Sequence, residues 1–276
     1  IMRIFSDTRP DINMSLKTKR FRVEPLPRLT PETRWRTEAM RSYSQPMLLW
    51  FTRGQGRITV AGVTHGFGPH HCVVLPPHTM HGYEMLGQVF GMSVFFPDDP
   101  TLRLPEEPMH LRFREVHQQN ELTTMIENLQ REIEGDRPGK DRALAAHAGL
   151  ISVWLDREIQ NGNPSELHPD AARRLAAAYS SMVERDFRSG RTINDYAAHL
   201  GVTPTHLTRS CNVACGRSAS ALLADRLHFE ARRMLVETRR PIKDIAAELG
   251  FRSAAYFTRA FQKHTGLTPS QFRRQG

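Results

Sequence analysis

The chain has 276 residues, of which 39% are hydrophobic, and it carries a formal net charge of +9. This length allows two domains of ordinary size, and the apolar content excludes a chain that is disordered throughout. The charge is uneven, because residues 169–276 hold 18 Lys and Arg against 9 Asp and Glu, whereas residues 1–168 hold 20 of each sign. A neutral front joined to a basic C-terminal part predicts a polyanionic partner for the C-terminal part alone.

The cysteines and the hydropathy pattern predict where the protein works. Its three cysteines are odd in number and widely spaced, which is not the pattern of a disulfide framework. The first residues contain no apolar run of the signal-peptide kind. No stretch approaches 18 consecutive apolar residues, so no membrane span is expected. We therefore expect a cytoplasmic protein without a membrane partner.

The first 117 residues divide into two parts. Residues 1–30 are polar and interrupted by prolines, which predicts an extended N-terminal arm. Residues 31–117 contain short apolar runs separated by Gly, Pro and His. Runs of this length that are rich in Val, Ile and Phe are typical of an antiparallel sandwich or barrel. The clearest are MLLWF (47–51), GRITVAG (56–62), HCVVLPP (71–77) and VFGMSVFF (89–96).

From residue 119 the apolar spacing becomes helical. One stripe follows i, i+3, i+4, i+7 and i+11. Its members are Leu122, Met125, Ile126, Leu129 and Ile133. A second helix is expected over 141–160, and the Asn-Gly-Asn-Pro turn at 161–164 is the expected domain boundary. Residues 118–162 are therefore predicted to be linker or dimerisation helices, in which the first stripe forms either intramolecular core or a dimer interface.

Residues 168–274 contain short helical segments without strand-like runs, and one helical unit occurs twice. In the second copy, Ile242 to Leu249 predicts a short helix, and Gly250 follows where a helix ends in a left-handed residue. In the first copy Gly201 stands at the same place. Two short helices around a glycine turn are a helix-turn-helix, so the sequence predicts two such units.

The second helix of each unit is expected to carry a polar and basic outer face. An outward arginine such as Arg259 can contact a guanine edge in the major groove, while other cations contact phosphates. Two helices on one rigid body should enter major grooves about 34 Å apart. The predicted DNA contacts are Thr205, Thr208, Arg209, Arg252, Ser253, Ala255, Thr258, Arg259, Gln262 and Lys263.

Residues 242–274 resemble the signature of AraC/XylS-type transcription regulators. The elements Gly-Phe-x-Ser, Tyr-Phe-x-Arg-x-Phe and Gly-x-x-Pro-x-x-Phe-Arg are all present. The first unit resembles the family less closely, because Cys211 stands where the family usually has Phe and residues 212–214 replace a commonly basic stretch. The resemblance implies a double-stranded DNA operator, contact with RNA polymerase, a homodimer and an N-terminal cupin-like barrel that senses a small molecule.

The predicted fold class is therefore α+β, with a cupin-like β-barrel over 31–117, the helical linker, and an all-α domain over 168–274 with two helix-turn-helix units. The Pro-Pro-x-x-x-His-Gly-Tyr run resembles sensors of aromatic or organic acids. Candidate effector contacts are Arg34, Trp50, His81, Tyr83, Met92 and Phe95. The alternative for His81 is a hydrogen-bonded histidine at a strand end, and for Trp50, Met92 and Phe95 it is plain core.

A metal-dependent cupin enzyme, such as a dioxygenase or isomerase with a helical appendage, is the competing class. Metal cupins use a His-x-His on an early strand, a downstream Glu and a later His. His81 stands at the place of the later His, but the early strand from Arg41 has no His-x-His, so a full ligand set is not evident. We therefore expect no metal, no cofactor and no catalytic residue. The expected function is a DNA-binding transcription regulator, an activator or a repressor, that responds to a small organic effector. An architectural DNA-binding protein without a ligand is a third possibility.

Overall fold

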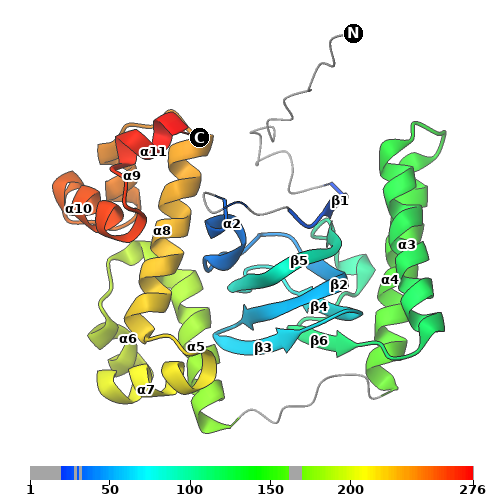
Figure 1. Cartoon of the computed structure of the whole chain (residues 1–276), viewed down its shortest axis with the longest axis horizontal. Helices are drawn as coiled ribbons and strands as arrows, with labels where there is room; N and C mark the ends of the chain where they lie inside the picture. The colour runs from blue at the N-terminus through cyan, green and yellow to red at the C-terminus, as the bar shows by residue number, and fades with distance from the viewer. Residues whose placement is uncertain (1–19, 28–29, 31–32, 162–169, 276) are drawn as a thin grey trace.

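The computed structural model describes residues 20–27, 30, 33–161 and 170–275, and it places a β-sheet between two groups of helices (Figure 1). Most of the predicted arm lies outside the described residues, and its last part contains the first strand. The strands are β1 (Arg22–Pro25), β2 (Met47–Val60), β3 (Val63–Phe67), β4 (His71–Leu75), β5 (His81–Phe95) and β6 (Met109–Arg112). All of their pairings are antiparallel, in the order β1-β5-β2-β4-β6, and β3 pairs with β2.

The sheet separates two layers of apolar side chains, because successive residues of a strand point to opposite faces. On β2, Leu49 and Phe51 face an inner core that the sheet curls around, whereas Leu48 and Trp50 face an outer layer. The pairing of β2 with β5 shifts between Phe51 and residue 55, as at a β-bulge, and after this point the even-numbered Ile58 faces inward. The stacking of Phe67 on Phe51, with ring centres 3.9 Å apart, joins the two parts of the inner core.

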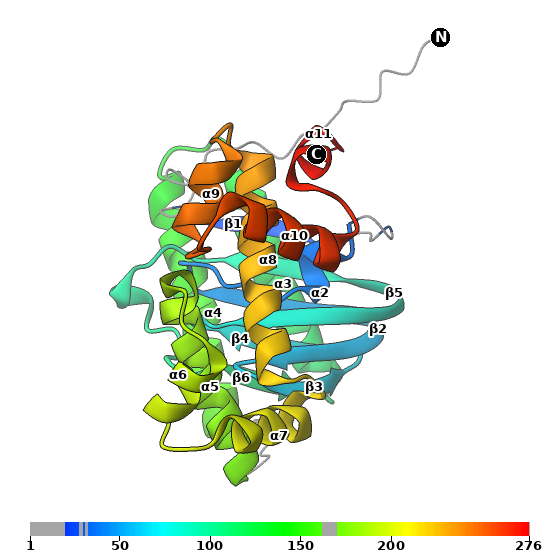
Figure 2. The ribbon, with the colours of Figure 1, turned by 90° about the vertical axis from the view of Figure 1, so that its left-hand side faces the viewer.

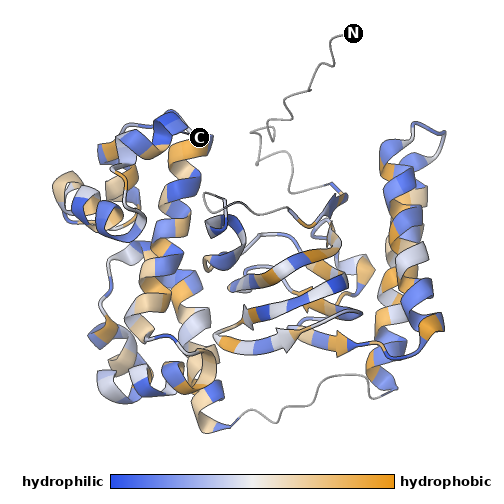
Figure 3. Ribbon diagram, viewed as in Figure 1, coloured by the Kyte–Doolittle hydropathy of each residue, from blue (hydrophilic) through white to orange (hydrophobic). Residues whose placement is uncertain are grey.

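Two long helices cover the outer face of the sheet. They are α3 (Val116–Glu134) and α4 (Lys140–Gln160), at the right of Figure 1. Figure 3 shows apolar residues recurring along these helices and along the strands. The helix expected over 141–160 is confirmed. Asn161 caps it, and the rest of the predicted boundary turn lies outside the described residues.

The apolar stripe of α3 packs inside the chain. Leu122, Ile126 and Leu129 are buried at 1% exposure or less in the outer layer, and Met125 and Ile133 are partly buried against the same cluster. Of the two alternatives for this stripe, the structure supports intramolecular core. A dimer interface through Leu122, Ile126 and Leu129 is wrong, because the sheet and α4 already cover these three side chains. For Met125 and Ile133 the interface stays a prediction.

The remaining helices form a second apolar core. They are α5 (Ala171–Asp186), α6 (Ile193–His199), α7 (Pro204–Cys215), α8 (Ala219–Glu237), α9 (Ile242–Glu248), α10 (Ala254–Thr265) and α11 (Pro269–Gln275). Two short 3₁₀ turns also occur: η1 (Pro100–Leu102) between β5 and β6, and η2 (Phe187–Ser189) between α5 and α6. The long α8 lies between the two helix-turn-helix units. The predicted α+β class is confirmed. No helix in the described part of the chain is long and apolar enough to cross a membrane.

A short helix, α2 (Trp35–Glu38), joins the sheet to these helices. The ring of Trp35 lies 5.7 Å from that of Phe229 on α8 and 5.9 Å from that of Phe272 on α11. After α2, Met40 enters the core of the C-terminal helices, and its backbone N–H donates to the Asp225 carboxylate at 2.8 Å. The segment that precedes β2 therefore holds the sheet against α8, as Figure 1 shows.

Candidate functional site

Helices α7 and α10 share five exposed positions, offset by 50 residues. The shared positions fall at i, i+1, i+4, i+7 and i+8, which is one helical face, and Pro204 and His264 are exposed in one helix only. The pairs are Thr205 and Ala255, His206 and Tyr256, Arg209 and Arg259, Asn212 and Gln262, and Val213 and Lys263. The predicted contacts Thr208 and Thr258 are half-buried at the edge of this face. We call the ten residues of these five pairs, without Thr208 and Thr258, the paired faces.

The opposite side of each helix is fixed by core packing. Leu207 and Cys211 on α7, and Phe257 and Phe261 on α10, are all fully buried. Cys211 takes the place of the phenylalanine expected from the family and fills the same core position. Because both helices are held on their inner sides, the paired faces have fixed orientations.

Each of these helices begins with a side-chain cap. The hydroxyl of Thr203 accepts from the backbone N–H of His206, and the hydroxyl of Ser253 accepts from that of Tyr256, each at 3.2 Å. Ser253, a predicted DNA contact, therefore already uses its oxygen within the helix. Arg252, another predicted contact, is exposed beside it. The two helices thus begin at equivalent positions, Thr203 and Ser253.

Helix α8 sets the distance between the two faces. It has 19 residues, which makes it about 28 Å long. Figure 2 shows α7 near one end of α8 and α10 near the other. Successive major grooves on one side of a DNA duplex lie about 34 Å apart. The arrangement therefore suits two helices that contact one face of the duplex a single turn apart.

Sequence reasoning missed four members of the paired faces. Val213 is 65% exposed and Tyr256 is 55% exposed, although both are large apolar or aromatic residues. His206 and Asn212 are exposed as well. The 50-residue offset between Arg209 and Arg259 would have found Asn212 and Val213, because it transfers the predicted Gln262 and Lys263 to the other helix. It would not have found His206 and Tyr256, which are each other's counterparts.

Asp225 connects the two helix-turn-helix units with the sheet. Its carboxylate lies 2.9 Å from the guanidinium of Arg217, which follows α7, and 3.6 Å from the imidazole of His264 on α10. It also accepts the N–H of Met40. Burial would raise the pKa of Asp225, but the hydrogen bond with His264 and the charge of Arg217 outweigh it and lower the pKa. Asp225 is therefore ionised, and its carboxylate can accept from Arg217, from His264 and from the backbone N–H of Met40 together.

The predicted effector residues do not form one site. His81, Tyr83 and Phe95 belong to the inner side of the sheet, whereas Trp50 and Met92 belong to the outer layer. Arg34 is exposed at the start of α2, on the side of the sheet that faces α8 (Figure 1). The strand periodicity of two separates these groups, so a single pocket lined by all six is wrong.

The inner group is closely packed. The imidazole of His81 is 1% exposed, its Nδ1 lies 2.8 Å from the carbonyl oxygen of Thr79, and its ring packs against Tyr43. Burial first, and then the neighbouring charge of Arg41, lower the pKa of His81 to about 3. His81 is therefore a neutral, hydrogen-bonded histidine at a strand end, which is the alternative that the sequence left open. Arg41 lies over the ring of Tyr83 and donates to the carbonyl of Thr37.

Three other histidines gather on strands β3, β4 and β6. Nδ1 of His71 lies 2.8 Å from Nε2 of His110, and the ring of His65 lies 5.7 Å from that of His110. Burial first, and then the charges of His71 and His65, lower the pKa of His110 to about 4, so this pair is neutral at pH 7. Within the described ranges, no group of three or more His, Cys, Asp or Glu is arranged to hold a metal ion.

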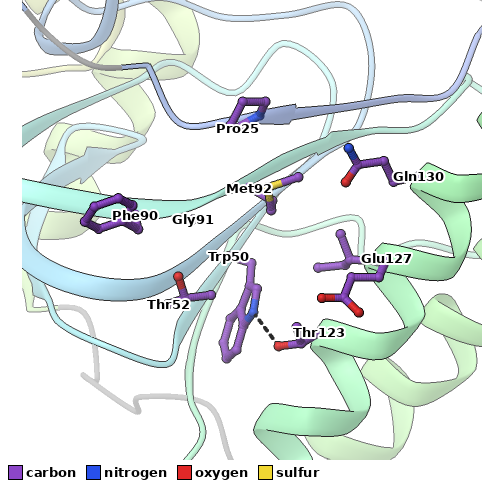
Figure 4. Close-up of a pocket in the computed structure, with 10 residues that line it drawn as sticks. Pro25, Trp50, Thr52, Phe90, Gly91, Met92, Thr123, Glu127 and Gln130 are labelled. Carbon is purple, nitrogen blue, oxygen red and sulfur yellow. Dashed lines mark hydrogen bonds between the residues drawn. The ribbon is translucent and has the colours of Figure 1, made fainter. Parts of the chain in front are cut away.

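A pocket of about 340 Å³ lies between the outer face of the sheet and α3 (Figure 4). The strands supply its apolar side, and α3 supplies its polar side. The indole N–H of Trp50 donates to the hydroxyl of Thr123 at 3.1 Å, which fixes the ring at the base of the pocket. The lining residues are Pro25, Trp50, Thr52, Phe90, Gly91, Met92, Thr123, Ile126, Glu127 and Gln130.

Gly91 allows the strands to approach at this pocket. A Cβ atom at this position would lie 2.0 Å from the carbonyl oxygen of Trp50, much closer than any real contact. A larger residue would therefore push β5 away from β2. Of the predicted effector contacts, Trp50 and Met92 are the two that line the pocket.

Comparisons with known proteins support the assignment of the C-terminal helices. A family model described as a helix-turn-helix domain matches residues 196–275. The arabinose operon regulatory protein of Escherichia coli K12 is 31% identical over 124 residues, which are 45% of this chain and 42% of that protein. The uncharacterized HTH-type transcriptional regulator YobQ of Bacillus subtilis is 26% identical over 196 residues, which are 66% of this chain and 79% of that protein. The chain thus spans less than half the length of the arabinose regulator.

A solved structure of wild-type ToxT from Vibrio cholerae with a bound unsaturated fatty acid is 14% identical, with a TM-score of 0.44 over 92% of this chain and 94% of that one. The paired helices and the matched residues define the C-terminal part as a helix-turn-helix DNA-binding domain. Over this domain the chain is similar to the arabinose operon regulatory protein, which agrees with the resemblance to AraC/XylS-type regulators seen in the sequence.

Proposed function

We propose that this protein is a sequence-specific transcription regulator that contacts two neighbouring major grooves with α7 and α10. The observation that carries this proposal is the pair of matching exposed faces at the two ends of α8. Each face presents one arginine at its centre, at 209 and at 259, with smaller or polar neighbours. An arginine in this position donates two hydrogen bonds to a guanine edge.

The two faces are not chemically equal. The α10 face carries Lys263 where the α7 face carries the apolar Val213, and Tyr256 where α7 carries His206. Phosphate contacts are therefore proposed mainly for α10, through Lys263 and Arg252, since a cation there neutralises the charge of a backbone phosphate. The α7 face is proposed to contribute base contacts through Arg209 and Thr205, and an apolar contact through Val213.

Selection of bound duplexes from a random DNA pool tests this proposal. The expected product holds two short conserved motifs whose centres are about 10 base pairs apart, because both helices lie on one side of the duplex. Binding of the selected duplex is then compared with that of a shuffled duplex at the same salt concentration. Equal affinity for both duplexes would refute sequence-specific regulation and leave only charge-driven binding.

The N-terminal part is proposed to sense a small organic effector. The division into a sensing domain over 31–117, linker helices over 118–162 and a DNA-binding domain over 168–274 accompanies this proposal. A ligand shifts the arrangement of the sheet and the C-terminal helices only by its different affinity for two arrangements. A homodimer, contact with RNA polymerase and a cytoplasmic location are proposed with it, from the resemblance to AraC/XylS-type regulators. The names of the related regulators support a function other than catalysis.

A further inference from the structure

The pocket beneath α3 has a chemical asymmetry that identifies its ligand. Its strand side is mainly apolar and aromatic, with Trp50, Phe90 and Met92, and Thr52 is the polar residue there. Its helix side presents Thr123, Glu127 and Gln130, which fall at i, i+4 and i+7 on one face of α3, as Figure 4 shows. A ligand bound here is therefore apolar at one end and polar at the other.

Glu127 is the charged residue of the lining. None of the ten lining residues is Lys, Arg or His. Among the described residues, no hydrogen bond or ion pair joins the Glu127 carboxylate to another side chain. Gln130 donates its amide N–H to Glu134 at 2.8 Å, which leaves its carbonyl oxygen as an acceptor beside Glu127. The polar side of the pocket thus offers acceptors and a negative charge.

We propose that this pocket binds an organic cation with an aromatic or similarly apolar body, such as an arylalkylamine. The ring of Phe90, which is 36% exposed, favours a cation through the negative potential of its face when the cation lies within about 6 Å. The carboxylate of Glu127 supplies the opposite charge for the bound cation. A carboxylate ligand would lose its hydration and meet the carboxylate of Glu127 without a cation in the lining, so an aromatic acid is disfavoured. The volume of about 340 Å³ suits a ligand with one ring and a short chain.

This inference rests on the proposed function only where it calls the ligand an effector. Thr123 and Glu127 lie on the helix that packs against both the sheet and α4. A ligand between β5 and α3 therefore acts on the packing of α3 against the sheet. Binding itself is measurable without DNA.

Three probes of nearly equal shape test the charge preference: 2-phenylethylamine, 2-phenylethanol and 3-phenylpropanoate. Each is titrated into the full chain by calorimetry, with tryptophan fluorescence as a second readout because Trp50 lines the pocket. The amine is expected to bind most tightly, the alcohol next and the acid least. Glu127→Gln is expected to weaken the amine by roughly threefold to fivefold, as for an exposed charge pair, and to leave the alcohol unchanged.

Two control variants keep the interpretation specific. Glu107→Gln removes an exposed carboxylate outside the lining and is expected to change no affinity. Phe90→Ala shortens the apolar side at a residue that is already 36% exposed, and is expected to weaken the amine and the alcohol alike. Arg53, whose guanidinium lies 5.6 Å from the ring of Phe90, is the cation that an acid would use.

The inference is overturned if the acid binds as tightly as the amine, or if none of the three probes binds. It is also overturned if binding of the acid is lost in the Arg53→Ala variant. Equal effects of Glu127→Gln and Glu107→Gln on the amine would also overturn it. Binding of the selected duplex is measured in the same preparations by fluorescence anisotropy. Specific DNA binding without amine binding rejects the pocket alone, and amine binding without specific DNA binding rejects the regulator alone.

Discussion

Gly201 and Gly250 occupy equivalent turns, with φ of +68° and +76°, but only Gly250 is enclosed. A Cβ atom at Gly250 would lie 2.5 Å from the carbonyl oxygen of Arg188, whereas one at Gly201 meets nothing within 4 Å. Alanine in the left-handed region costs about 1–2 kcal/mol at either position. We expect Gly250→Ala to lower the free energy of unfolding by more than Gly201→Ala, as measured by urea denaturation. Equal losses would show that the second turn moves freely away from Arg188.

Glu230 is a buried carboxylate that makes stability depend on pH. Burial would raise its pKa, but the hydrogen bond from Arg233 and the charges of Arg233, Arg226 and Arg188 lower the pKa from 4.5 to about 2. A carboxyl group with a lowered pKa in the folded state stabilises the fold above pH 4.5, and this contribution is lost as the pH falls toward 2.

The free energy of unfolding is therefore expected to fall more steeply between pH 4.5 and pH 3 in the wild type than in Glu230→Gln. Urea titrations at a series of pH values measure the two slopes. The glutamine variant is less stable at pH 7, because each of the three arginines loses one of its two carboxylate partners. Parallel slopes would assign the acid sensitivity to other carboxylates.

At the scale of the helices, Arg209 and Arg259 are expected to act at different base pairs. Arg209→Ala and Arg259→Ala should each cost roughly 1–3 kcal/mol on the selected duplex and relax the base preference at one motif only. Competition with single-base variants of the duplex measures this. The double variant is expected to be additive, because α8 separates the two side chains. An equal loss on selected and shuffled DNA would make either arginine a phosphate contact.

The helices were predictable because their signals are local. Apolar spacing predicts the helix over 141–160, and Gly250, whose φ is positive in the structure, marks the predicted turn of the second unit. The strands were predictable as strands, but the residues that face each side were not. The register shift after Phe51 exchanges the inward positions on β2, and a shift of this kind depends on the partner strand β5. Trp50 and Phe95, predicted as one site, lie on opposite faces because Phe95 pairs with Met47, and Trp50 follows Met47 by three residues in a strand that alternates its faces.

At the scale of the whole molecule, the sequence did not predict the contact of α2 with the C-terminal helices. Trp35 and Met40 meet residues about 185 to 240 positions further along the chain, at Asp225, Phe229 and Phe272. No local pattern encodes such a contact, since it depends on how two finished cores meet. The same contact reaches both helix-turn-helix units, because Asp225 also binds Arg217 and His264.

Trp35 is expected to hold the sheet against α8. Besides its contacts with Phe229 and Phe272, its ring carries the guanidinium of Arg232 at 5.2 Å. Trp35→Ala removes these three contacts but leaves the inner core of the sheet and the α3–α4 layer intact. We expect backbone hydrogen exchange to accelerate in α2 and at the α8 segment around Phe229, with no change in α3 and α4.

Trp154→Ala is the matched control, because Trp154 packs on Phe113 with ring centres 4.8 Å apart in the outer layer. That variant is expected to accelerate exchange in α3 and α4 and to leave α2 unchanged. If Trp35→Ala leaves the exchange of α2 and α8 at wild-type rates, the ring does not hold the two parts together. The link would then rest on the Asp225 hydrogen bond to Met40, which Asp225→Asn tests by the same measurement.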